Sequence, residues 1–142
     1  MKKVMTIIAC CGFTLGFASV TISGTLTLVV GDTSEKGDVR AAVFSSQTDF
    51  ENGDSSFALS RSATSSETKL EIEDLPPGNY GVAVFQDLNG NEQLDRNLFA
   101  VPTEPYGFSQ NPVISFSAPH FDEFDFEFTG TPLELNIVLN GG

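Results

Sequence analysis

The sequence predicts an all-β fold, a single antiparallel β-sandwich of about seven strands with Greek-key connections; a closed barrel is the alternative. Three observations support this prediction. Apolar and polar residues alternate with a period of two in several segments, prolines and glycines separate those segments, and no segment keeps helical periodicity for more than a turn or two. The chain has 142 residues, which suits one domain with one hydrophobic core.

Strands with one solvent-exposed face are expected near both ends of the domain, where the alternation is clearest. Polar residues such as Thr27, Asp125 and Asn136 stand between the apolar ones. The residues expected to face the core are Leu26, Leu28 and Val30 near one end and Phe124, Phe126, Phe128, Leu133, Leu135, Ile137 and Leu139 near the other.

Three further strands are expected in the middle of the chain. Residues 38–46 and 68–75 alternate in the same way. Residues 80–85 are apolar or small on both faces, which is typical of a central strand covered on both sides. A turn at Pro77 and Gly78 precedes this strand, because proline presets φ and glycine accepts a positive φ.

Two long connections separate the strands. Residues 47–67 are rich in serine, aspartate and threonine and are expected to form a mobile loop or a loop with one weak edge strand. Residues 97–120 contain four prolines and four aromatic rings, which favours an ordered, packed loop over a linker. Loops of this length are usually functional or disordered.

The N-terminus has the pattern of a secretory signal peptide. Lys2 and Lys3 precede an apolar stretch that is too short to span a bilayer comfortably. Gly16 and Ala18 are small residues at the −3 and −1 positions, which predicts cleavage after Ala18; a site a few residues later is the alternative. Residues 1–18 are then the signal peptide and residues 19–142 a single domain. We expect export to the periplasm or the extracellular space, with no membrane span in the mature chain.

Charge and cysteine content narrow the function classes. Cys10 and Cys11 lie inside the predicted signal, so no disulfide is expected; a lipoprotein cleavage site at Cys10 is the alternative. The formal net charge is −12, and loss of Lys2 and Lys3 makes the mature chain more acidic. Such a surface repels phosphates and anionic lipid headgroups, so nucleic acid is not an expected partner.

Oxygen-bearing side chains recur at every second position after residue 86. In the register of an EF-hand loop they occupy the first, third, fifth, seventh and ninth positions, from which such loops bind calcium. These residues are Asp87, Asn89, Asn91, Gln93 and Asp95. The pattern predicts a Ca²⁺ site with these ligands; the alternative is a polar turn whose asparagines and glycine tolerate left-handed conformations.

Two positions of this loop depart from the EF-hand pattern. Glu92 stands at the sixth position, where a sharp turn favours glycine, and Leu98 stands at the twelfth, where a bidentate glutamate is usual. Since few carboxylates remain, we expect weak calcium affinity.

Aromatic residues in the second long connection suggest a ligand surface. Tyr106 and Phe108 are candidate contacts for a small ligand or a carbohydrate, with His120 nearby in the sequence. The alternative is that these rings plug the end of the sandwich, and that the lone His120 is a packed or capping residue.

No catalytic set is evident, so we expect a protein that is not an enzyme. No second histidine can pair with a serine, and no glycine-rich phosphate loop is present. A carboxylate-based hydrolase stays open as an alternative that requires two acidic side chains converging in a pocket.

Several motifs resemble a known bacterial family. Leu75-Pro76-Pro77-Gly78-Asn79-Tyr80 is similar to the turn and strand of transthyretin-like or prealbumin-like sandwich modules. Together with the Asp87 to Asp95 run and Tyr106-Gly107-Phe108-Ser109, the chain resembles the family named domain of unknown function 2141. The resemblance implies an exported transthyretin-like or immunoglobulin-like sandwich and no established activity, and Glu92 and Pro105 depart from its usual glycines. We therefore expect a noncatalytic structural or binding module whose partner is an unknown protein or saccharide.

Overall fold

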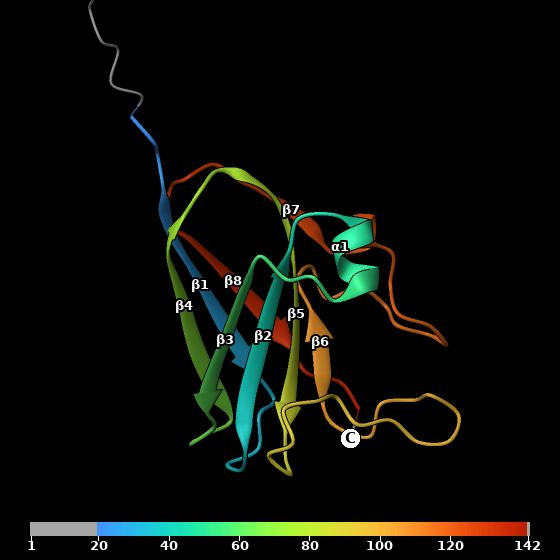
Figure 1. Ribbon diagram of the computed structural model, residues 1–142. Helices are drawn as coiled ribbons and strands as arrows, with labels where there is room; N and C mark the ends of the chain where they lie inside the picture. The colour runs from blue at the N-terminus through green and yellow to red at the C-terminus, as the bar shows by residue number, and fades with distance from the viewer. Residues whose placement is uncertain (1–19, 142) are drawn as a thin grey trace, which may run out of the picture.

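The computed structural model describes residues 20–141, which form two β-sheets packed face to face (Figure 1). The strands are β1 (Gly24–Gly31), β2 (Asp38–Phe44), β3 (Phe57–Ser62), β4 (Glu67–Leu75), β5 (Gly78–Asp87), β6 (Tyr106–Phe108), β7 (Asp125–Phe128) and β8 (Leu133–Val138). Two short helices are α1 (Gln47–Asn52) and the 3-10 helix η1 (Phe121–Glu123). The prediction of an all-β sandwich is confirmed, whereas the predicted signal peptide with Cys10 and Cys11 lies outside the described residues.

Each sheet is built from strands that are not all consecutive in the sequence. The first sheet has the order β4-β1-β8, and the second has the order β3-β2-β5-β6, with β7 paired to the beginning of β5. β1 and β8 run parallel, with Leu26 opposite Leu133, and the other strand pairs are antiparallel. Because β7 and β8 lie in different sheets, the chain crosses between the sheets at residues 129–132.

The main core lies between the sheets and follows the predicted alternation. The apolar residues expected to point inward are buried, or are partly buried and packed against this core, except that Phe124 is buried in a second cluster. Fully covered examples from four strands are Leu28, Val43, Val82 and Ile137. The longest helix of the described residues has six residues, and none is long and apolar enough to cross a membrane.

β5 is covered on both faces, as predicted for a central strand. Val82 and Val84 point into the main core, while Gly81 and Ala83 face a second cluster that contains Phe124. A Cβ on Gly81 would lie 2.4 Å from a ring carbon of Phe124, so only glycine fits there. β5 is therefore packed on both faces, and its last residue, Asp87, begins the following loop from this packed strand.

Residues 47–67 form a short helix and an edge strand, so the second of the two predicted forms is confirmed. Ser46 caps α1 by accepting a hydrogen bond from Asp49 N at 3.1 Å, and Gly53 ends the helix at φ 75°. Phe50 of α1 packs edge-on against Phe44 and Phe124. The helix therefore covers part of the outer face of the second sheet.

Residues 97–120 are ordered around β6, but only some of their rings are packed. Phe108 is buried and Tyr106 is half-buried. Phe99 is 87% exposed and Phe116 is 105% exposed, so the expectation of a fully packed loop is wrong for these two rings. The physical reason is that both rings stand in segments between strands and belong to neither of the two hydrophobic clusters.

Candidate functional site

The candidate site lies where β5 ends and the chain leaves the sandwich. Figure 1 shows two loops on the same side of the molecule, the gold loop that follows β5 and the orange loop that follows β6. The first loop begins at Asp87 and contains the predicted calcium ligands, which we call loop 87–97.

Asp87 is fully buried and its carboxylate holds the beginning of loop 87–97. Its Oδ1 accepts a hydrogen bond from Gly90 N, and its Oδ2 accepts one from Glu92 N, both at 2.8 Å. Arg40 Nε on β2 lies 3.1 Å from Oδ2. Burial alone would raise the pKa of Asp87, but the N–H groups of Glu92 and Gly90 and the charge of Arg40 outweigh it and lower that pKa.

Glu92 adopts the conformation that its position demands even though it is not glycine. Its φ is 66°, in the left-handed region, and the N–H of this sixth residue donates to the carboxylate of Asp87, the first residue. Its side chain turns back to Arg40, with Oε1 3.0 Å from Nη2. Loop 87–97 therefore keeps the sharp turn of an EF-type loop without the glycine.

Three of the five predicted ligands converge on one another. The side-chain amides of Asn89 and Asn91 each donate a hydrogen bond to the carboxylate of Asp95. The distance from Asn91 Nδ2 to Asp95 Oδ1 is 2.8 Å. Asn89 Oδ1 also accepts from Asn91 N at 3.1 Å, and Asn91 Oδ1 accepts from Gln93 N at 3.0 Å. Asp87 forms its hydrogen bonds with other residues, namely Arg40, Gly90 and Glu92.

Glu104 is a residue of this site that sequence reasoning did not single out. It is 4% exposed, and its two carboxylate oxygens accept hydrogen bonds from Leu88 N at 2.9 Å and Asp95 N at 3.1 Å. It thus ties the beginning of the loop to its ninth position. Arg40 was also missed. Neither residue carries a local sequence signal, because both reach loop 87–97 from other parts of the chain.

The oxygen donors of loop 87–97 could hold a hard cation. Asp87 Oδ1 receives a single N–H and a carboxylate oxygen has two acceptor positions, so one position stays open. Within residues 20–141, no three acidic, histidine or cysteine side chains gather into a metal cluster. A cation would therefore be held mainly by amide and backbone oxygens, a donor set that suits Ca²⁺ better than a transition metal.

An apolar pocket of about 320 Å³ lies directly beside loop 87–97. Its walls come from residues 94–102 and residues 114–118, and β6 contributes to its lining. The main apolar residues are Leu94, Phe99, Val101, Tyr106, Ile114 and Phe116. Two residues near the end of loop 87–97, Leu94 and Arg96, line the pocket and flank Asp95, so loop and pocket are physically continuous.

The predicted aromatic contacts occupy different parts of this region. Tyr106 and Phe108 line the pocket, but their rings meet edge-on at 83° with centroids 6.2 Å apart, so they do not form a flat platform. His120 stands at the beginning of η1, where its backbone N–H donates to Glu123 Oε2 at 2.6 Å. It is not among the residues that line the apolar pocket.

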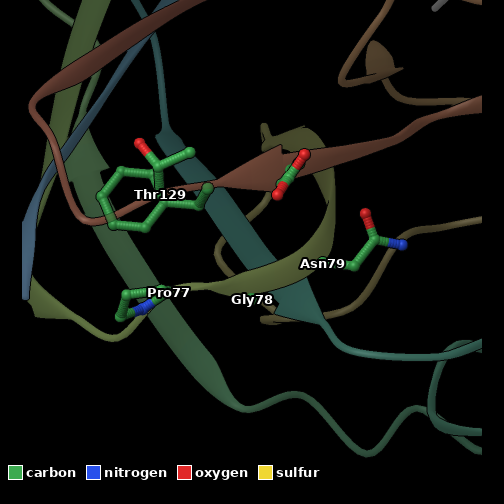
Figure 2. A pocket seen from close by; sticks show the side chains of 6 residues that line it. Pro77, Gly78, Asn79 and Thr129 are labelled. Atoms are coloured by element: carbon green, nitrogen blue, oxygen red, sulfur yellow. The ribbon is translucent and has the colours of Figure 1, made fainter.

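A second depression lies at the other end of β5 and has a different character. Figure 2 shows Pro77, Gly78, Asn79 and Thr129 around a shallow groove between β5 and β7. Asn79 Nδ2 already donates to Asp125 Oδ2 at 2.6 Å. This groove therefore offers fewer free polar groups and less enclosure than the pocket beside loop 87–97.

Comparison with known families assigns the chain. A family model described as "Uncharacterized protein conserved in bacteria (DUF2141)" matches residues 28–136, which is most of the chain. The chain belongs to this DUF2141 family. Comparisons with curated proteins and with solved structures find no match. The DUF2141 match includes both loop 87–97 and the apolar pocket, so the site lies within the family's domain.

Proposed function

We propose that this DUF2141 chain is an exported, noncatalytic binding module in which calcium orders loop 87–97 and so fixes one wall of the apolar pocket. The observation that carries the proposal is the continuity of loop and pocket, because Asp95 lies between the pocket residues Leu94 and Arg96. A bound cation would hold Asp95 and thereby the two residues beside it.

The geometry of loop 87–97 supports calcium as the cation. Asp95 would supply the central carboxylate, and Asp87 would add its open acceptor position. Asn89 and Asn91, whose amide N–H groups now face Asp95, would turn their amide oxygens toward the cation when it binds. Gln93 would contribute a backbone carbonyl, as the seventh residue of an EF-type loop does. When bound, calcium would supply charge that orders the loop; no chemical step is assigned to it.

The pocket lining supports binding rather than catalysis. Arg96 is the one charged residue among the residues that line it, and a guanidinium has five N–H donors and no acceptor. Such a group can hold a ligand but cannot serve as a general base. The mostly apolar walls favour a small-ligand site, the second role considered for residues 97–120, over an extended saccharide cleft.

Titration calorimetry tests the calcium claim directly. We expect Ca²⁺ to bind with a dissociation constant of about 0.1–1 mM, as for extracellular modules of low ligand charge. Asp95→Asn should abolish the heat, while Asp122→Asn, which changes an exposed acid in η1, should leave it unchanged. Absence of heat together with an unchanged melting temperature at millimolar calcium would refute the calcium claim.

A further inference from the structure

The exposed apolar surface of the described residues is concentrated at the pocket beside loop 87–97. Large hydrophobic side chains with high exposure recur along its two loops. Phe99, Val101 and Phe116 line the pocket itself, and Leu98 and Val113 lie on the same loops outside the lining. Exposed apolar side chains that line a pocket favour a binding site there.

The turn that exposes the first of these side chains is rigidly built. Asn97 Oδ1 accepts hydrogen bonds from Phe99 N at 2.9 Å and Val101 N at 3.1 Å, and Asn97 N donates to Val101 O at 2.9 Å. Arg96 Nη1 also donates to Ala100 O at 3.2 Å, and Ala100 is held at φ 60°. The exposure of Phe99 is therefore set by the backbone of an ordered turn.

The size of the pocket limits what it can hold. Its 320 Å³ is near the lower end of the range for small-molecule sites, about 300–1,000 Å³. A pocket of this size takes an aromatic compound of two or three rings or a short acyl chain.

A single positive group marks the polar side of the pocket. Arg96 has five N–H donors, of which one is used by Ala100 O. The net charge of −12 acts against anions at long range, but salt screens charges beyond about 8 Å at physiological ionic strength, so the direct contact decides. Guanidinium groups bind carboxylates and sulfonates through paired hydrogen bonds.

We propose that this pocket binds a small apolar anion, an aromatic or short-chain carboxylate or sulfonate, with its apolar part between Phe99 and Phe116 and its acid group on Arg96. The inference rests on the proposed binding function of the same pocket and adds its ligand class. A saccharide fits less well, because apolar walls would leave many of its hydroxyls without partners.

Fluorescence titration with two matched probes tests this inference on the protein purified from the periplasm of an expressing bacterium. Anilinonaphthalene sulfonate is an apolar anion, and phenylnaphthylamine has the same rings without the charge. We expect one binding site for each probe, with the anion about three- to tenfold tighter. Arg96→Gln should remove that preference and leave the neutral probe unchanged.

Exposed residues provide variants that should fold normally. Phe116→Ser should weaken both probes about tenfold, whereas Val113→Ser, equally exposed in the same loop but outside the pocket lining, should weaken neither. Hexanoate should displace the probes better than hexanol does.

The two claims fail in different ways. If Arg96→Gln leaves the preference for the anion intact, or if no preference exists, the anion assignment is overturned while the pocket stands as a binding site. If Phe116→Ser changes neither probe, the pocket itself is not the site and the proposed binding function falls. A dimer in sedimentation that Phe116→Ser dissociates would assign the pocket to a second copy of the chain and overturn the inference.

Discussion

Phenylalanines gather at two places on the outer side of the second sheet, and only one of these clusters is covered. One cluster has ring centroids 5.0–5.9 Å apart and is covered, since α1 contributes Phe50 and η1 contributes Phe121. Its other members are Phe44, Phe108 and Phe124. Phe99 and Phe116 lie on the neighbouring loops and face solvent. The same residue type serves as core in one region and as surface in the other. The covered cluster stabilises the sheet, and the uncovered one is available to a ligand.

The largest expected effect separates the two clusters by stability. Phe124→Ala removes a fully buried ring and should lower the free energy of unfolding by about 3–5 kcal/mol. Phe116→Ala should change it by less than about 0.5 kcal/mol, because that side chain loses no packing. Urea unfolding with a common slope measures both. Similar losses for the two variants would contradict the division into core and surface rings.

A smaller loss is expected from the carboxylate that anchors loop 87–97. Asp87→Asn should destabilise the protein, since the charge that faces Arg40 and two N–H groups is removed. The lowered pKa of Asp87 gives this loss a pH dependence. The stabilisation is fully present above the ordinary pKa of 3.8 and is lost as the pH falls through the lower pKa of the folded state. The free energies of unfolding of the two proteins, measured from pH 7 downward, should converge only in acid. A difference between them that stays constant in acid would contradict the role of the Asp87 charge.

Glu104→Gln should act locally on the wall of the pocket. An amide has one acceptor oxygen in place of two, so one of Leu88 N and Asp95 N loses its partner, at a cost of about 1–3 kcal/mol. Hydrogen exchange should quicken at these two amides and leave the core strands unchanged. Glu127→Gln, an exposed change on β7, is the matched control. Equal exchange in both variants would remove Glu104 from the site.

The smallest effect concerns the backbone of loop 87–97. Glu92→Gly relieves a positive φ but loses the contact with Arg40, whereas Glu92→Ala loses the contact without relief. The glycine variant should therefore be more stable than the alanine variant by about 1 kcal/mol. Thermal unfolding of the pair measures the difference, and equal stability would mean that the turn at this position is not strained.

The two phenylalanine clusters also show which features of the fold the sequence could predict. Alternation assigned inward faces to Leu28, Val30 and Phe126 correctly, because a period of two depends only on the two faces of a strand. It could not reveal that β1 and β8 run parallel, since the pattern is the same in either direction. Nor could it separate Phe108 from Phe116, because the cover over the first ring comes from α1, more than fifty residues earlier in the chain.

The loop shows the same limit at the scale of single residues. The spacing of Asn89, Asn91 and Asp95 predicted their grouping, which is a local property of a tight turn. Arg40 and Glu104 could not be predicted as partners, because sheet pairing brings the first beside Asp87 and the return of the chain into β6 brings the second. The distant partners of loop 87–97 therefore needed the fold.

The link between loop and pocket can be measured by titrating phenylnaphthylamine with and without calcium. If calcium fixes the wall that contains Leu94 and Arg96, 10 mM Ca²⁺ should tighten the uncharged probe about threefold relative to chelator, a coupling near 0.7 kcal/mol. Asp95→Asn should abolish the change. An identical dissociation constant in calcium and in chelator, with the probe bound normally in both, would contradict the claim that calcium orders this pocket.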